Sequence, residues 1–291
     1  MSLQLPSRAA ASVKTGARAA VLGLGLLALG ACSAEDKDQL GRLAMPIPAS
    51  EQAPATYDLW KWAWVAAMVT GVIVWGLLFF AAWRYRRRST NLVPVQTRYN
   101  LPLEIFYTVA PILMVIVFFF HTVQTQNVMT EIKDDPDVTI DVVGQQWSWT
   151  FNYTEQGEGG QTPYTVGTTN DRPTLVLPVD QTVAFQLHSP DVIHSFSIDV
   201  FLTKLDIIPG RVNVLQVTPT RIGDFRGKCF EFCGAYHSRM IFDVKVVSAA
   251  DYQAYLAELQ EKGNVAPAPL LGGSAVNTQP GLNTDAEGEH S

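Results

Sequence analysis

The chain is poor in cysteine and in positive charge. Its 291 residues include three cysteines, and 21 lysines and arginines stand against 27 aspartates and glutamates, for a formal net charge of −6. A chain this acidic does not favour a nucleic-acid partner. An odd number of cysteines cannot pair entirely within one chain, which excludes a complete disulfide framework. The sequence also lacks an internal repeat.

The N-terminus has the pattern of an exported protein. A positively charged leader precedes an apolar run, residues 19–29, that is too short to span a bilayer. We therefore predict a signal peptide over residues 1–31, followed by an extracytoplasmic linker over residues 32–58. The segment LGAC also resembles a bacterial lipoprotein box, which predicts that Cys32 becomes the lipidated mature N-terminus. The alternative is an ordinary signal peptide with an incidental cysteine.

Two long apolar runs predict a transmembrane hairpin over residues 59–123. Residues 62–83 contain no charge, have tryptophan at both ends and, at about 1.5 Å per residue, can cross a hydrocarbon core of about 30 Å. A buried soluble helix is the alternative. The second run, 105–120, contains Pro111, which is expected to kink it. The connecting loop, residues 84–103, carries five arginines, so the positive-inside rule places it in the cytoplasm.

The sequence changes character after residue 130. Short runs of β-branched and aromatic residues alternate with Gly, Pro, Asn and Asp, which predicts an all-β sandwich or barrel over residues 131–247. A helix is predicted over residues 248–262, with Ser248 as its N-cap. Residues 263–291 are rich in Pro, Gly, Asn and Asp and are predicted to be disordered.

The most informative stretch is GKCFEFCGAYHSRM, residues 227–240. It places two thiols, an imidazole and a thioether within twelve positions, at Cys229, Cys233, His237 and Met240. Soft sulfur ligands combined with imidazole favour copper. Zinc is less consistent with a methionine and with the lack of a further Cys or His pair in zinc spacing. A disulfide between the two cysteines is the other alternative, because this region is predicted to lie outside the cytoplasm.

A copper site on a β sandwich also needs a ligand from a distant strand or loop. His194, in DVIHSFSI, lies 35 residues before Cys229 and is favoured over His188, which ends a run whose alternation indicates a packed or half-exposed side chain. Two thiolates can bridge two coppers, each completed by one histidine and one weak axial ligand, of which one is a backbone carbonyl. The side chains assigned to these roles are Cys229 and Cys233 as bridges, His194 and His237 as terminal ligands, and Met240 as an axial ligand.

These motifs resemble a known family. The pattern C-x-E-x-C-x3-H-x2-M, with DVIHS, DIIPGRVN and the hairpin, is similar to subunit II of the haem–copper cytochrome c oxidases over residues 57–262. The lipoprotein box, a polar insertion and the acidic tail resemble the form found in actinobacteria. The resemblance implies an all-β cupredoxin-like sandwich preceded by a two-helix transmembrane hairpin, with a dinuclear copper A centre. The family's copper ligands fall on His194, Cys229, the Glu231 carbonyl, Cys233, His237 and Met240.

The resemblance also implies a function. Such a chain accepts electrons from cytochrome c and passes them to haem in subunit I, where oxygen reduction is coupled to proton translocation, in a bacterial cell membrane with the copper domain outside. Trp147, in GQQWSWTFNY, matches the tryptophan through which electrons enter, and Glu104 matches the glutamate at the mouth of a proton pathway. The Glu231 carboxylate is implied to bind magnesium at the boundary with subunit I. The residues alone favour a packed strand residue for Trp147 and a solvated charge at a helix start for Glu104.

The implied partners are oxidase subunit I, other oxidase subunits, membrane lipid and a cytochrome c donor. Many family members surround the copper loop with acids that attract a basic soluble cytochrome c, but basic residues bracket the loop here: Arg226, Lys228 and Arg239. This favours a membrane-bound or complex-bound donor, although an acidic patch remains open from Glu155, Glu158, Asp171 and Asp191. The alternative function is a membrane-anchored copper chaperone or thiol reductase that uses Cys229 and Cys233.

Overall fold

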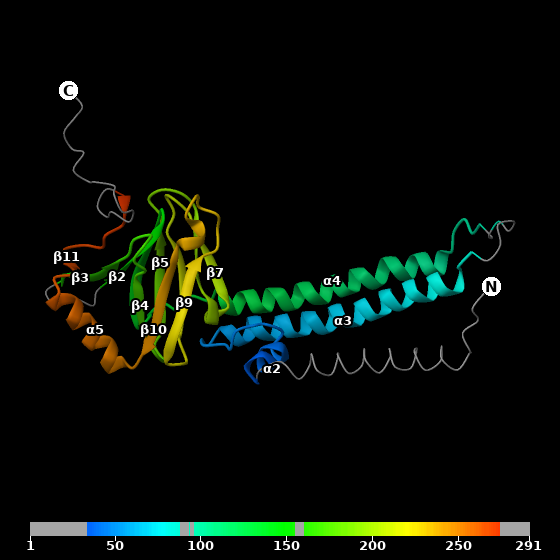
Figure 1. Ribbon diagram of the computed structural model, residues 1–291, viewed down its shortest axis with the longest axis horizontal. Coiled ribbons are helices and arrows are strands. Elements are labelled where there is room, and N and C mark those ends of the chain that lie inside the picture. The colour runs from blue at the N-terminus through cyan, green and yellow to red at the C-terminus, as the bar shows by residue number, and fades with distance from the viewer. Residues whose placement is uncertain (1–33, 88–92, 94–95, 155–159, 274–291) are drawn as a thin grey trace, which may run out of the picture. The chain divides into compact units, whose positions relative to one another are not determined.

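The computed structural model describes residues 34–87, 93, 96–154 and 160–273 (Figure 1). The chain divides into two compact units, residues 1–46 and 47–291. In the first unit the described element is the short helix α2 (Ala34–Gly41), which lies within the predicted linker. The predicted signal peptide and Cys32 lie outside the described residues.

The second unit begins with a segment that packs on the β domain. The Ala49 side chain is buried in the hydrophobic core, and Ser50 forms an isolated β-bridge with Pro219. The Ser50 hydroxyl also accepts a hydrogen bond from the Ala53 N–H, where the first long helix begins. The last part of the predicted linker is therefore part of the folded unit, because its apolar side chains find a place in the sandwich.

Among the described residues, two helices have the length and apolar composition needed to cross a membrane: α3 (Ala53–Arg84) and α4 (Leu101–Met129). They contact each other and extend beyond the predicted hairpin at both ends. Pro111 lies inside α4, which continues through it. At the start of α4, the Asn100 side chain accepts a hydrogen bond from the Leu103 N–H, and Glu104 accepts one from the Asn100 N–H. This reciprocal cap fixes where α4 begins.

A sandwich of two mixed sheets follows, as predicted (Figure 1). The first sheet has the order β11-β3-β2-β1-β5-β8, and the second has the order β4-β10-β9-β6-β7. Two neighbouring pairs are parallel, β1 with β5 and β4 with β10. The bounds of the first sheet are β1 (Val138–Gln145), β2 (Ser148–Thr154), β3 (Thr162–Val166), β5 (Val183–His188), β8 (Asn213–Val217) and β11 (Val265–Ala266). Those of the second are β4 (Thr174–Pro178), β6 (His194–Ile198), β7 (Thr203–Ile207), β9 (Gly223–Cys229) and β10 (Ile241–Val247). The short 3-10 helices η2 (Asp199–Phe201) and η3 (His237–Arg239) lie in the connections between strands.

Aromatic rings fill the space between the two sheets. Phe196 of β6 stacks on Phe242 of β10 with ring centroids 5.3 Å apart, and Trp149 of β2 meets both rings edge-on. Gly227 of β9 lies directly against Phe242, where a Cβ would come within 2.0 Å of the ring. The glycine therefore allows β9 and β10 to pair closely. This packing fixes the two strands whose ends carry the candidate site.

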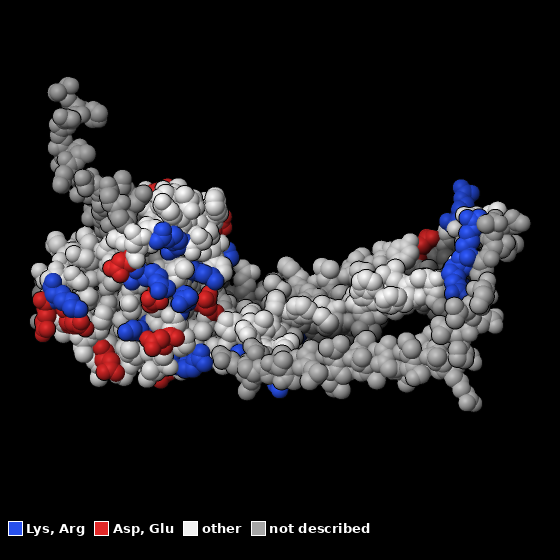
Figure 2. All heavy atoms as spheres, in the orientation of Figure 1, with Lys and Arg blue, Asp and Glu red and all other residues white. Residues whose placement is uncertain are grey.

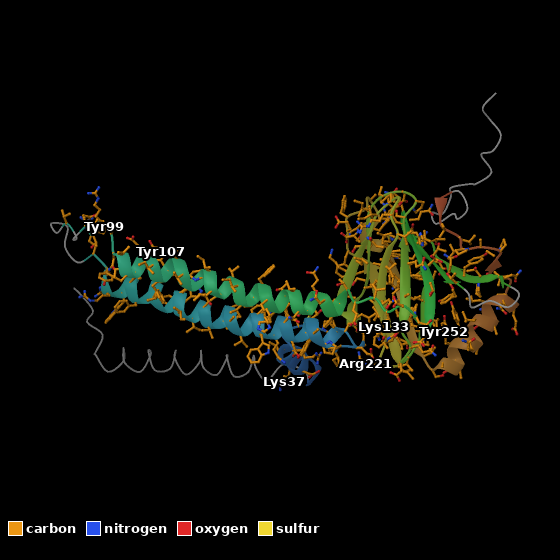
Figure 3. All side chains as sticks on the ribbon, turned by 180° about the vertical axis from the view of Figure 1, so that it is seen from behind. Lys37, Tyr99, Tyr107, Lys133, Arg221 and Tyr252 are labelled. Atoms are coloured by element: carbon orange, nitrogen blue, oxygen red, sulfur yellow. The ribbon has the colours of Figure 1, made fainter. Side chains whose placement is uncertain are left out.

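The helix α5 (Ala249–Glu261) agrees with its prediction. The Ser248 hydroxyl accepts a hydrogen bond from the Asp251 N–H at 3.1 Å, which confirms the predicted N-cap. Tyr252, labelled in Figure 3, is fully buried and packs edge-on against Tyr153 at 6.1 Å. The helix thus covers the part of the sandwich formed by β3 and β4.

The first part of the predicted disordered tail is ordered. Residues 264–273, here called the C-terminal strap, begin with β11 pairing to β3. The buried Asn152 side chain then donates to Leu270 C=O at 3.2 Å and accepts from Leu270 N–H at 2.8 Å. Gln145 makes the same two kinds of bond with Gly273. The tail's composition predicted disorder because it does not reveal these backbone bonds to partners more than a hundred residues away. Residues 274–291 lie outside the described part of the chain.

Candidate metal centre

The candidate ligands lie at one end of the five-stranded sheet. Cys229 is the last residue of β9, and the ligand loop, residues 230–240, returns from it into β10. A hydrogen bond of 3.0 Å from the Cys229 N–H to Met240 C=O joins the two ends of this loop. His194 is the first residue of β6, whose Phe196 pairs with Cys229 of β9. Strand pairing therefore brings His194 to the loop.

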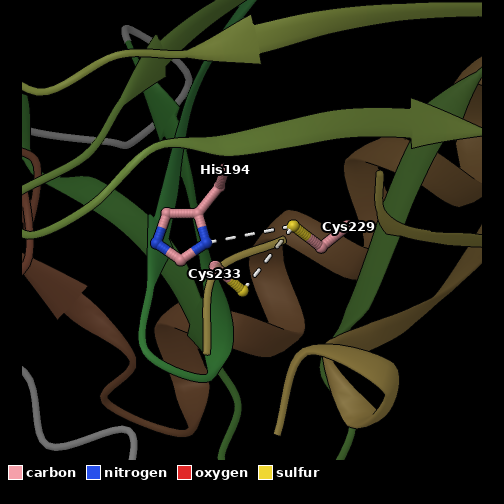
Figure 4. Close-up of side chains that lie close together, drawn as sticks. All are labelled: His194, Cys229 and Cys233. Atoms are coloured by element: carbon pink, nitrogen blue, oxygen red, sulfur yellow. Dashed lines mark hydrogen bonds between the residues drawn. The ribbon is translucent and has the colours of Figure 1, made fainter. Parts of the chain in front are cut away.

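Sulfur and imidazole groups converge at this point (Figure 4). The Sγ atoms of Cys229 and Cys233 are 3.9 Å apart, and His194 Nδ1 is 3.9 Å from the Sγ of Cys229. From the Sγ of Cys233, His237 Nδ1 is 3.5 Å away and the Sδ of Met240 is 3.7 Å away. All five predicted side-chain ligands thus lie in one cluster.

The cluster fits copper better than it fits a disulfide. Both cysteines are free thiols, and their sulfur–sulfur distance is nearly twice the roughly 2.05 Å of a disulfide bond. The carbonyl oxygen of Glu231 lies 3.2 Å from the Sγ of Cys229, where the sequence places the second axial ligand. His194, Cys229, Cys233 and Met240 are buried. Buried thiol, thioether and imidazole donors are the set that copper prefers.

Hydrogen bonding prepares one of the thiols to bind metal. The hydrogen bond between the two thiols lowers the pKa of Cys229 to about 4; burial opposes this shift, and the bond to His194 adds to it. The same thiol–thiol bond, together with burial, raises the pKa of Cys233. The lowered pKa favours the thiolate form of Cys229, and the thiolate is the form that binds metal.

Asp191 fixes the orientation of His194. Its carboxylate accepts hydrogen bonds from His194 Nε2 at 2.9 Å, from Gln146 N–H at 2.8 Å and from Val192 N–H at 2.6 Å. With Nε2 used in this way, Nδ1 is left to face the sulfurs. Partial burial raises the pKa of Asp191, but these hydrogen bonds outweigh it and leave that pKa below its ordinary value. Burial likewise lowers the pKa of His194, and the bonds to Asp191 and Cys229 outweigh it, so that pKa is raised.

This role corrects part of the predicted acidic patch. Asp191 is one of the four residues left open for that patch, but its side chain is 25% exposed and is bonded to His194. Sequence reasoning missed this function, although the spacing of three residues in DVIHS could have suggested it. Glu155 and Glu158 lie outside the described residues, and Asp171 is exposed.

Trp147 contacts the ligand loop directly. Its indole N–H donates to the carbonyl of Cys233 at 3.2 Å, and the Gln146 side chain donates to the same oxygen at 2.7 Å. Gly234 follows Cys233, and a Cβ there would lie 3.0 Å from the indole ring. The glycine therefore allows the ring to lie against the loop, one peptide group away from a candidate ligand.

The remaining predicted residues lie elsewhere. Glu104 caps α4 and is not part of the metal cluster. His188 is bonded to the buried Asp141 at 2.7 Å, on the six-stranded sheet, whereas His194 lies beside the two cysteines, which is where the sequence-based preference expects the ligand. Among the basic residues, Lys228 is 3.6 Å from Asp199, and Arg239 donates to the Asn170 side chain at 2.7 Å.

The fold and the site define a class: a membrane-anchored β sandwich with a buried cysteine, histidine and methionine cluster at one end. Residues 138–247 match the family described as "Cytochrome C oxidase subunit II, periplasmic domain". The probable cytochrome c oxidase subunit 2 of Streptomyces avermitilis is 43% identical over 286 residues, covering 87% of this chain and 89% of that protein. The cytochrome c oxidase subunit 2 of Corynebacterium glutamicum is 35% identical over 296 residues, covering 81% and 82%.

The chain therefore belongs to the cytochrome c oxidase subunit II family, and it is part of an oxidase complex. Among solved structures, the periplasmic domain of subunit II of cytochrome oxidase (CoxB) from Bradyrhizobium japonicum is 28% identical, with a TM-score of 0.40, and covers 45% of this chain and 99% of that one. The matched periplasmic domain and the two membrane-length helices indicate a membrane-anchored chain with an extracytoplasmic domain.

Proposed function

We propose that this chain is the electron inlet of its oxidase: it takes electrons from a cytochrome c and delivers them to haem in subunit I. There, oxygen reduction is coupled to proton translocation. The observation that carries this proposal is the cluster of sulfur, imidazole and carbonyl groups at the end of β9, in which each candidate ligand atom lies within 4 Å of another. His194, both cysteines and Met240 in this cluster are buried.

The residues that would hold a dinuclear copper centre are His194, Cys229, the Glu231 carbonyl, Cys233, His237 and Met240. When bound, a dinuclear copper centre would supply one-electron transfer with little change in bond length, because the electron would be shared over both ions. The protein's part is to keep the donors fixed. Burial excludes water from the sulfurs, and Asp191 holds the His194 ring through Nε2.

Trp147 is the proposed point of entry. The hydrogen bond from its indole to the Cys233 carbonyl is a short connection between the outside of the domain and a ligand residue. The ring is partly buried against the core, which holds it in place. This support is geometric, and electron uptake by variants of Trp147 tests it.

Further roles follow from family membership. We propose that the Glu231 carboxylate binds magnesium at the contact with subunit I, that Glu104 lies at a proton entrance, and that Cys32 carries lipid. The chain would cross the bacterial cell membrane twice, with the arginine-rich connection in the cytoplasm. The donor is a cytochrome c, and membrane-bound and complex-bound forms fit the basic residues near the ligand loop.

Copper content and electron paramagnetic resonance of the full-length chain test the proposal. The chain is purified in detergent, reconstituted with copper and compared with Cys233→Ser and with His188→Gln. We expect two coppers per wild-type chain and a hyperfine pattern from one electron shared over two nuclei. Cys233→Ser should lose this pattern, and His188→Gln should keep it because His188 bonds to Asp141 instead.

The opposite result would favour the alternative function. One copper per chain, or none with Cys229 and Cys233 oxidised to a disulfide, would refute the dinuclear site. It would support a copper chaperone or thiol reductase in its place.

A further inference from the structure

We propose that electrons enter through two rings, Trp147 and Tyr236, and that Tyr236 both positions Trp147 and contacts the donor. This inference rests on the proposed function, since it concerns the surface at which the donor is received. It assigns a role to Tyr236, which immediately precedes the candidate ligand His237 in the ligand loop.

The two rings form one surface. Their centroids are 5.1 Å apart and their planes are nearly perpendicular, at 87°, an edge-to-face arrangement that is favourable between aromatic rings. Trp147 is also held from the side of the loop by its hydrogen bond to Cys233. The indole therefore has two fixed contacts with the ligand loop. Removing Tyr236 would leave one of them.

Tyr236 is itself held in place. The guanidinium of Arg239 lies 5.7 Å from the centre of the Tyr236 ring, within the range of a cation–π contact. Arg239 in turn donates a hydrogen bond of 2.7 Å to Asn170, in the connection between β3 and β4. Arg239 thus links the ligand loop to the connection between β3 and β4, and the Tyr236 ring contacts both Arg239 and Trp147.

The surface fits an apolar contact more than an acidic or basic one. Tyr236 is 40% exposed, so its ring reaches solvent. Of the nearby charges, Asp191 is bonded to His194, and Arg239 is bonded to Asn170 and lies over the Tyr236 ring. Figure 2 shows mostly uncharged atoms at the end of the sandwich to which β9 leads. The partner that fits is a cytochrome c whose exposed haem edge is surrounded by uncharged side chains.

The test uses the purified oxidase complex with Tyr236→Phe, Tyr236→Leu and Arg239→Gln. Tyr236→Phe keeps the aromatic ring, and Tyr236→Leu replaces the ring with an apolar side chain. Arg239→Gln leaves the ring in place but removes the cation–π contact that holds it. Phe230→Leu is the matched control, because Phe230 has similar exposure, 42%, in the same loop and packs against Lys228. Copper content and the paramagnetic spectrum are recorded first, which establishes that each variant has folded and holds its metal.

We expect Tyr236→Leu to raise the KM for cytochrome c by about 3- to 10-fold, the equivalent of one edge-to-face pair. Arg239→Gln should raise it by about 2- to 5-fold. Tyr236→Phe and Phe230→Leu should remain near wild type. Binding of a zinc-porphyrin cytochrome c, which does not turn over, should weaken in the same order. The KM should change little with ionic strength, because apolar contact is not screened by salt.

Three results would overturn the inference. They are an unchanged KM and zinc-cytochrome affinity in Tyr236→Leu, an equal loss in Phe230→Leu, and a steep dependence of binding on salt. These three results are interpretable only when the wild-type oxidase oxidises cytochrome c. If the wild-type complex takes no electrons from any cytochrome c, the proposed function fails instead, so the two failures are distinguishable.

Discussion

Asn152→Asp provides a sharp test of how the C-terminal strap is held. The substitution changes one NH2 group into an oxygen and leaves the shape of the side chain almost unchanged. The remaining oxygen can still accept from the Leu270 N–H, at 2.8 Å in the wild type. The new oxygen would face the carbonyls of Leu270 and Asp141, which now accept hydrogen bonds from the Asn152 amide at 3.2 and 3.3 Å.

The expected cost follows from the lost bond to Leu270, because the bond to Asp141 does not involve the strap. At about 1 kcal/mol, losing it corresponds to a population of opened strap about 5-fold higher than in the wild type. The new carboxyl group would be buried, because Asn152 is 0% exposed, and burial raises the pKa of a carboxyl group. A raised folded-state pKa means that the variant is least impaired at acid pH and loses stability as pH rises through that pKa.

Hydrogen exchange of the full chain, read by mass spectrometry on peptides from residues 264–273, measures the opening of the strap. Asn213→Asp is the matched control. Its side chain also donates to a backbone carbonyl, that of Asp206 at 2.6 Å, but it lies away from the strap. If the strap peptides exchange at the same rate in Asn152→Asp as in the wild type or in Asn213→Asp, the Asn152 amide does not hold the strap.

Three further predictions follow from contacts at the site and in the core. Gly227→Ala should destabilise the sandwich by about 1–3 kcal/mol, because the added Cβ clashes with Phe242. Gly41→Ala is the control, since its Cβ meets nothing within 4 Å. Equal thermal unfolding of the two variants would contradict this prediction. Asp191→Asn should weaken copper retention by about 10- to 100-fold in a chelator titration, because it disturbs the partner of His194; unchanged retention would remove that positioning role. The metal-free chain should show thiolate absorbance at pH 6 that Cys229→Ser abolishes, since the pKa of Cys229 is about 4; absorbance that appears only above pH 8 would disagree.

The sequence predicted the parts of the site that depend on short spacing. Residues of the ligand loop are close in the chain, so their chemistry could be recognised without coordinates. The alternation along β5 indicated that His188 is a packed or half-exposed residue, and the structure places it against Asp141, away from the cysteines. The function of Asp191 could not be deduced as readily, since its carboxylate looks like any surface charge until the start of β6 is placed.

Long-range contacts limited the rest of the prediction. The strap was expected to be disordered because its composition is that of a tail, and its order depends on Asn152, which lies 118 residues before Leu270. The link from Arg239 to Asn170 likewise joins residues 69 apart. Hydrophobic periodicity reveals which face of a strand is buried, but it does not reveal which polar side chain meets a distant backbone group.

The strap also affects the order in which the domain can be completed during export. The bonds between Gln145 and Gly273 join residues 128 apart, so the edge beside Trp147 stays open until almost the whole chain has been synthesised and moved across the membrane. The ligand loop, at residues 230–240, emerges earlier. There is thus an interval in which both thiols are outside the cytoplasm while the sandwich lacks its last strand, β11. Delivery of metal during that interval would meet a more accessible site than the finished domain offers.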